Sequence, residues 1–328
     1  MDNKRRIAYL DFVKLWAIML VVWGHALIRI DPEFSAGGFA HSFIYSFHMP
    51  LFMLVSGFFA ASSLRQGFWQ MLEKKSKQLL LPAVTCTLLS IAYFLIVRGG
   101  CDYYTEVVGN SWFLKTLFAC YLLLWGGKKI LKRDWLLLPL AVVMFIVPHA
   151  YSLQLNYLFP FFLLGYFMGK ERKSLERYMG KIAIVSLVVF FLLFLGNGKA
   201  FASRNIFIGY NTLLHEFSLI CLKYAFALTG SLASIGLGYY LCKLSAEAVS
   251  ISKLGRYTLG IYVLQTFFLI DVFPDIFKGD IENPWLLNFI AAPLVTIFML
   301  WLCIAVIRQI SKSRIMDLLF FGGVYRQK

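Results

Sequence analysis

Charged side chains are scarce in this chain, and acidic ones are the scarcest. Asp, Glu, Lys and Arg make up 15% of the 328 residues, whereas about 25% is usual in soluble domains. There are 17 acidic residues against 32 basic ones. So low a charge content argues against a large soluble enzyme and against a disordered chain, because both depend on charged surface to stay hydrated.

The chain also lacks a set of cysteines in hydrophilic loops. Five of its six cysteines fall inside or at the ends of apolar runs, and only Cys101 lies in a hydrophilic loop. We therefore expect no extracellular disulfide framework. No small-residue cleavage site closes the first apolar run, 7–30, and that run is long enough to span a bilayer. A cleavable signal peptide is not expected either.

Apolar residues are abundant instead: 60% of the chain is hydrophobic, and its mean hydropathy is +0.71. A transmembrane helix needs about 20 apolar residues. We predict an all-α, polytopic membrane protein with about ten transmembrane helices, within a single integral-membrane domain of residues 1–328. The candidate spans are 7–30, 43–63, 79–97, 112–127, 135–150, 155–169, 182–195, 213–241, 254–270 and 286–307.

The basic residues are distributed very unevenly between these spans. In a soluble protein a net charge of +15 would indicate nucleic-acid binding. Here, with ten spans, 24 of the 32 Lys and Arg residues fall in alternate segments beginning with the N-terminus, and 5 fall in the opposite loops. Positive residues collect on the cytoplasmic side of membrane proteins. The distribution predicts that both termini are cytoplasmic, and no nucleic-acid partner is expected.

The first span carries three ionisable residues, Asp11, Lys14 and His25, and such residues inside a membrane are costly and often functional. A helix turns 100° per residue, so all three share one stripe. Lys14 and His25 lie about 16 Å apart along the axis at 1.5 Å per residue. Asp11 and Lys14 can pair. Two interpretations are open for them: a structural ion pair or part of an active site.

His25 and His48 are predicted at similar depth near the outer face, on neighbouring antiparallel helices. Three accounts are open for them: a general base with helpers, a metal site, or polar residues at a wet interface. Imidazole suits a base near neutral pH. No His-x-x-x-His or Glu-x-x-His pair supplies two ligands from one helix, so no metal is expected.

Lys115 and Lys223 are the other cations predicted inside the membrane. Lys115 lies one turn from the outer start of its helix, where its amine can reach water. Lys223 is deeper, so we expect a carboxylate or an anionic ligand to compensate its charge.

Several segments together resemble the membrane acyltransferase-3 family, and they occur in the family's order over nearly the whole chain. They are RIAYLDFVK (6–14), VVWGH (21–25), FHMPLFMLVSGF (47–58), KKSKQLLLP (74–82), WFL (112–114), FFLLGY (161–166) and LGRYTLGIY (254–262). Three features depart from the family pattern. Lys14 and the inner-loop lysines stand where Arg is frequent, and Gln265 stands where the family often has His.

The resemblance implies a ten-helix enzyme of the bacterial inner (plasma) membrane that transfers an acyl group, usually acetyl, from acyl-CoA to a hydroxyl. The expected acceptor is a cell-surface glycan or a lipid-linked saccharide. The resemblance further implies that His25 is essential and that Lys14 matters. It also implies a role for the basic inner loop, whose Lys74, Lys75 and Lys77 are candidates to hold the phosphates of an acetyl-CoA donor.

We expect His25 to deprotonate the acceptor hydroxyl, with Lys14, Asp11 and His48 as further candidates for the catalytic site. A covalent acyl-histidine is the alternative within the same class. A transporter or exporter of a glycan or an acylated metabolite is the alternative from another class, because ten helices and intramembrane charge fit it equally well. The expected partners are the donor, the acceptor and membrane lipid.

Overall fold

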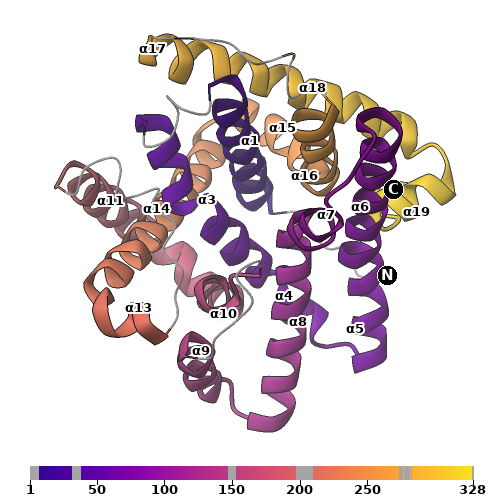
Figure 1. The fold of residues 1–328 in the computed structure, drawn as a ribbon. Helices are drawn as coiled ribbons and strands as arrows, with labels where there is room; N and C mark the ends of the chain where they lie inside the picture. The colour runs from indigo at the N-terminus through magenta and orange to yellow at the C-terminus, as the bar shows by residue number, and fades with distance from the viewer. Residues whose placement is uncertain are drawn as a thin grey trace.

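All regular elements in the described part of the chain are helices, which confirms the all-α prediction there (Figure 1). The computed structural model describes residues 7–31, 38–146, 153–196, 210–272, 276, 281 and 283–326. The elements, with 3₁₀ and π segments labelled η, are α1 (Ala8–Ile30), α3 (Phe39–Phe58), α4 (Ala60–Ser63), α5 (Phe68–Lys75), η1 (Ser76–Leu80), α6 (Leu81–Tyr93), η2 (Phe94–Arg98), α7 (Tyr103–Gly109), α8 (Trp112–Leu131), η3 (Asp134–Leu136), α9 (Leu137–Ile146), α10 (Leu155–Lys170), α11 (Arg172–Gly196), α13 (Tyr210–His215), α14 (Phe217–Leu244), α15 (Ala246–Ser252), η4 (Lys253–Tyr257), α16 (Thr258–Thr266), η5 (Phe267–Val272), α17 (Pro284–Leu286), η6 (Leu287–Ala291), α18 (Ala292–Ile310) and α19 (Arg314–Phe321).

Five helical stretches are long and apolar enough to cross a bilayer: Ala8–Ile30, Phe68–Arg98, Arg172–Gly196, Phe217–Leu244 and Pro284–Ile310. A sixth is obtained if α7 and α8, which meet at a bend of 47°, count as one span. Each of the ten predicted segments overlaps a helix, but α9, α10 and α16 have only 10, 16 and 9 residues. These three are too short, since about 20 residues cross a membrane, and α3, with 20 residues, is the fourth predicted segment that is not among the long apolar stretches. The predicted segment 135–150 also ends in residues 147–150, which lie outside the described part.

The outer helices expose large apolar side chains along their length. On α11 the exposed fractions are 66% for Ile184 and 65% for Leu192, and on α18 they are 60% for Ile297 and 65% for Trp301. An apolar surface this continuous is not stable in water, but it matches lipid chains. The chain therefore has the surface of a membrane protein.

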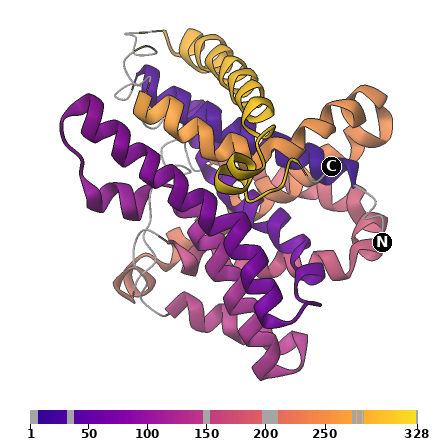
Figure 2. The same cartoon turned by 90° about the vertical axis from the view of Figure 1, so that its right-hand side faces the viewer.

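Helices α1 and α3 lie inside the bundle, with α6, α8, α10, α14 and α18 arranged around them (Figure 1). The orange α16 and η5 run beside the indigo α1 (Figure 2). Side chains of α1 such as Val13, Ile18 and Val22 are completely buried. The ionisable stripe of α1 is thus kept away from lipid, where an unpaired charge would be costly.

Helices α3 and α10 pack backbone to backbone through glycines. A Cβ on Gly57 would collide with the carbonyl of Phe162, and a Cβ on Gly165 would collide with the carbonyl of Leu54. A Cβ on Gly169, four residues after Gly165, would likewise collide with the backbone of α3. Small residues at this spacing are how membrane helices approach each other closely. This contact holds α3, and with it His48, against the centre of the bundle.

Gly165→Ala is expected to destabilise the protein by about 3 kcal/mol, because the new methyl group meets a backbone carbonyl that cannot move aside. The measurement is the thermal unfolding temperature of the detergent-solubilised protein. Gly126→Ala is the matched control, since a Cβ at Gly126 on α8 has no atom within 4 Å. Equal unfolding temperatures for the two variants would contradict the proposed packing role.

Candidate active site

The side chain of His25 contacts that of Gln265 across the interface of α1 and α16. Its Nδ1 lies 2.9 Å from Oε1 of Gln265. Gln265 is completely buried, whereas His25 is half-buried. The residue that departs from the family pattern in the sequence is therefore the direct partner of the predicted base.

The surrounding hydrogen bonds determine which nitrogen of His25 carries the proton. The amide Nε2 of Gln265 donates to Oγ1 of Thr266 at 2.8 Å and to the carbonyl of Tyr262 at 3.4 Å. Its Oε1 is therefore the atom that faces His25, and a carbonyl oxygen only accepts. Nδ1 of His25 must then donate, which leaves a lone pair on Nε2. An imidazole held in this tautomer is ready to act as a base.

His48 lies on α3, which contacts α1 beside His25. Its Nδ1 donates to the backbone carbonyl of Ile44 at 2.8 Å, so its Nε2 is also the unprotonated nitrogen. The rings of Tyr45 and His48 are arranged edge to face, with their centroids 4.9 Å apart. The ring of Tyr45 also packs against Gly24, the neighbour of His25. The side chain of Tyr45 thus lies next to His48 and next to the segment that carries His25.

Asp11 and Lys14 form the ion pair that their spacing suggested, with 3.0 Å between Nζ and Oδ1. The ammonium group of Lys14 also lies over the ring of Phe59, 4.3 Å from its centroid. The pair favours the structural interpretation, but both residues also line a cavity, so a role towards a ligand stays a prediction.

That cavity has a volume of about 940 Å³, which is in the range of small-molecule sites. Its polar lining includes Asp11, Lys14, Gln78, Arg256 and Arg308, and aromatic and leucine side chains make up much of the remainder. Tyr262 also lines it and stands three residues before Gln265. Neither His25 nor Gln265 is in the lining.

Of the three lysines in the basic inner loop, one contacts a residue that lines this cavity. Lys75 lies over the ring of Tyr121, a lining residue, at 3.9 Å from its centroid. Lys77 pairs with Glu73, the residue one turn earlier, at 2.5 Å. Lys74 stands beside Lys75 on α5 and does not line the cavity.

Arg256 and Arg308 are the cations that the sequence interpretation overlooked. Arg256 belongs to the motif at 254–262, but it carried no role there, and Arg308 appeared only as one more inner basic residue. Their common partner, Tyr257, is adjacent to one and 51 residues from the other. The contact with Tyr257 and the place in the cavity lining distinguish Arg308, and neither is visible in the local sequence.

The remaining intramembrane cations are compensated by protein groups. Lys115 was expected to reach water, but its Nζ donates to the carbonyls of Val107 at 2.5 Å and Asn110 at 2.8 Å. It therefore caps the end of α7 and stabilises the bend before α8. Lys223 lies over the ring of Tyr157 at 4.7 Å, a cation–π contact that contributes to this compensation.

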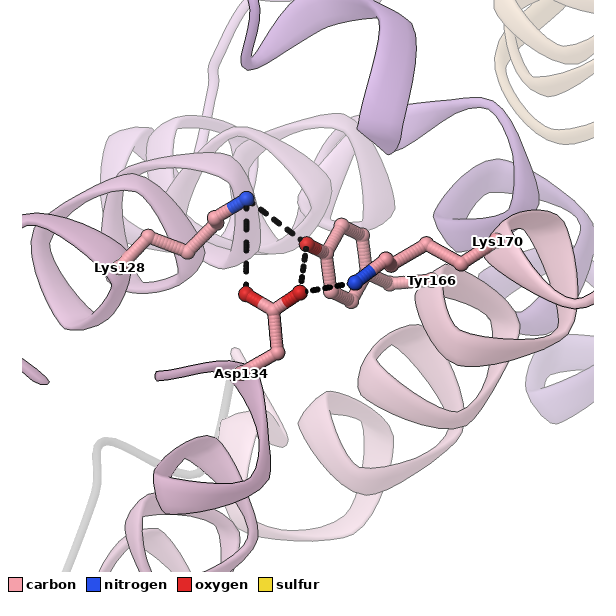
Figure 3. Close-up of polar contacts among 4 residues, drawn as sticks. All are labelled: Lys128, Asp134, Tyr166 and Lys170. Atoms are coloured by element: carbon pink, nitrogen blue, oxygen red, sulfur yellow. Dashed lines mark hydrogen bonds and ion pairs between the residues drawn. The ribbon is translucent and has the colours of Figure 1, made fainter. Parts of the chain in front are cut away.

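Asp134 links the ends of α8 and α10, as Figure 3 shows. Lys170 and Lys128 both contact its carboxylate, the latter at 3.5 Å, and the hydroxyl of Tyr166 donates to it at 3.2 Å. Burial raises the pKa of the Asp134 carboxyl, but the hydrogen bond from Lys170 and the two positive charges outweigh this and hold the pKa below its usual value. The cluster brings together two loops that the charge distribution assigns to the cytoplasm.

Among the described residues, no group of three or more His, Cys, Asp or Glu side chains could hold a metal ion. The site instead consists of a buried histidine–amide contact at one end and a cation-lined cavity at the other. The class defined by these features is a membrane protein, all-helical in its described part, with a polar candidate site inside its bundle.

The family profile of the acyltransferase domain called acyltransferase-3 matches residues 7–308. The chain belongs to this family and is a membrane acyltransferase.

Two curated relatives carry the name nodulation protein NolL. The chain is 29% identical over 299 residues to the protein of Sinorhizobium fredii, covering 80% of this chain and 78% of that protein. It is 29% identical over 241 residues to the protein of Mesorhizobium japonicum, covering 65% of this chain and 61% of that protein. No solved structure matches the chain significantly.

Asp134→Asn is expected to lower the stability of the protein at pH 7 by about 1 kcal/mol, a value typical of exposed ion pairs. The folded pKa of Asp134 lies below its unfolded value of about 3.9, so the cluster stabilises the fold above that pH. The difference from wild type should disappear as the pH falls below about 4. Unfolding temperatures of the wild type and the variant, measured from pH 7 to below about pH 4, test this prediction. Glu216→Gln, at a glutamate outside the cluster, should show no such pH-dependent difference.

Proposed function

We propose that the protein transfers an acyl group, most simply acetyl, from acyl-CoA to a hydroxyl of a cell-surface glycan or a lipid-linked saccharide, with His25 as the general base. The observation that carries the proposal is the contact of Nδ1 of His25 with Oε1 of the buried Gln265, since an acceptor at Nδ1 makes Nε2 the basic nitrogen of a neutral imidazole. Membership of the acyltransferase-3 family supports the reaction class.

In the proposed reaction, Nε2 of His25 removes the proton of the acceptor hydroxyl while its oxygen attacks the thioester carbonyl. The carbon–sulfur bond breaks, the new ester forms, and the CoA thiolate takes up the proton. Gln265 holds the orientation of the ring and accepts a hydrogen bond from the imidazolium, which stabilises it without adding a charge. Base catalysis of this kind contributes about 10²–10⁴-fold to the rate.

The donor is proposed to enter through the cation-lined cavity on the cytoplasmic side. A thioester on a long neutral arm could extend from there towards Tyr262, which is one turn from Gln265. Lys14 lines this path, and Lys75 lies at the wall formed by Tyr121. Lys74 and Lys77 remain candidates for weaker contacts with the phosphates of the donor, and the acceptor would approach His25 from the outside.

We also propose that the chain, as one integral-membrane domain, crosses the bacterial inner membrane ten times with both termini in the cytoplasm. Contacts between segments assigned to the inner side support this topology. Gly322, after the last span, packs on the backbone of Lys77, and Gly255 packs on that of Asp11. The short helices α9, α10 and α16 would then cross within the bundle, where neighbouring helices shield their ends.

The function is tested by measuring release of free CoA from acetyl-CoA by the purified protein with a panel of glycan acceptors. We expect release that requires an acceptor and falls at least about 10²-fold in His25→Ala. Detection of an acetylated enzyme in the absence of acceptor would indicate the covalent route instead of direct transfer. Uptake of a glycan into vesicles without any thioester consumption would instead indicate the transporter.

Gln265→Ala in the same assay separates positioning from mere folding. It should lower kcat by about 10-fold and leave KM for acetyl-CoA unchanged, since only the orientation of His25 is lost. Gln265→Glu retains an acceptor for Nδ1–H and should keep most of the activity. Loss of activity in the Glu variant but not in the Ala variant would contradict the positioning role.

The topology is tested by labelling single cysteines with a membrane-impermeant maleimide in intact cells. With the other five cysteines replaced, Cys101 should react from outside. A cysteine introduced by Ser313→Cys, in place of Cys101, should react only after permeabilisation. Labelling of both in intact cells would overturn the proposed orientation.

A further inference from the structure

Two arginine side chains meet on a single tyrosine at the edge of the cavity. Nη2 of Arg256 and Nε of Arg308 both donate to the hydroxyl of Tyr257, the second at 3.5 Å. Their guanidinium carbons lie 4.5 Å and 5.9 Å from the centroid of the Tyr257 ring. Tyr257 is buried, whereas both arginines are exposed.

The fold holds this pair in place from three sides. Arg256 follows Gly255, where η4 packs directly on the backbone of α1 at Asp11. Arg308 follows Ile307, which packs against Gly260 on α16. The hydroxyl of Tyr325 accepts from the amide of Gly260 at 3.0 Å, so the C-terminal segment closes the third side.

Neither arginine is neutralised by a carboxylate within the described residues. Lys14, Lys77 and Lys128, by contrast, each pair with an aspartate or glutamate. Two like charges brought to one phenol oxygen repel each other unless an anion or water screens them. Guanidinium groups present planar forks of N–H donors, the geometry that binds a phosphate group through two hydrogen bonds.

The shape of the cavity indicates what kind of anion fits. Arg256, Arg308 and Lys14 line it together with Tyr325. Phe113 and Tyr262, whose ring centroids lie 5.7 Å apart, line it as well, and Tyr262 stands one helical turn before Gln265. The lining thus combines three cations with an aromatic pair, of which Tyr262 lies on the helix that carries Gln265. A ligand with phosphates at one end and a narrow uncharged arm at the other matches this arrangement.

We propose that Arg256 and Arg308, presented by Tyr257, form the subsite that binds the phosphates of the acyl-CoA donor. The proposal rests on the proposed function for the identity of the donor. It assigns the main contact with the phosphates to η4 and α18, and only a minor contribution to phosphate binding to the inner-loop lysines. The hydroxyl proton of Tyr257 remains available to the phosphate, because both arginines use its oxygen as an acceptor.

The test compares binding of CoA and of pantetheine, which has the same arm but no phosphates, to the full-length protein in nanodiscs of phosphatidylcholine. Calorimetry should give tighter binding of CoA than of pantetheine to the wild type. Arg256→Gln and Arg308→Gln should each weaken the binding of CoA by about 10-fold or more and leave the binding of pantetheine unchanged. Arg314→Gln, at an exposed arginine outside the cavity lining, is the matched control.

Three results would overturn the subsite. One is equal binding of CoA and pantetheine by the wild type. Another is unchanged CoA binding in both arginine variants, especially if Lys75→Gln weakens it instead. The third is an effect of the arginine variants only when phosphatidylglycerol is added, which would identify a lipid phosphate as the ligand.

The transfer assay separates this proposal from the proposed function. CoA binding that depends on both arginines, without acetyl transfer to any acceptor, would support the subsite and count against the transferase. Transfer that requires His25 but has a KM for acetyl-CoA independent of both arginines would support the transferase and reject the subsite.

Discussion

The rest of the structure depends on one constraint: the ionisable stripe of α1 has to be kept out of contact with lipid. Three charged or titratable side chains on a single apolar helix would be costly at the bundle surface. The fold meets this constraint by surrounding α1 with other helices and by leaving the apolar faces of α11 and α18 on the outside. Glycine contacts then let η4 come close to α1, and let α10 come close to α3, so that the central helices are fully enclosed.

Enclosure of the stripe produces a site with two chemically different ends. At one end His25 contacts the neutral Gln265, which orients the ring without adding a charge. At the other, Lys14 and the arginines on Tyr257 line an open cavity rich in donors. The two ends are connected by α16, which carries Tyr262 in the cavity wall and Gln265 one turn later. An acyl group carried on a long arm is the kind of substrate that makes use of both ends.

Much of this arrangement was predictable, and the reasons differ from residue to residue. The pairing of Asp11 with Lys14 followed from helical spacing alone, because residues three apart are neighbours on any helix. The presence of Gln265 at an unusual position was visible in the motif, but its bond to His25 joins residues 240 positions apart. Arg308 gave no local signal, since its role depends on the long-range contact with Tyr257. The carbonyl partners of Lys115 belong to the end of the preceding helix, and a hydropathy pattern does not contain such contacts.

The sequence by itself determined the class: long apolar runs with few charges can satisfy their backbone groups in a membrane only as helices. It also determined which residues share a face of α1, because helix geometry is the same in every fold. Only the tertiary structure decided which nitrogen of His25 is free and which cations line the cavity. These depend on side chains from different helices meeting at distances of about 3 Å, and that proximity is decided by how α1, α16 and α18 pack, which no local pattern specifies.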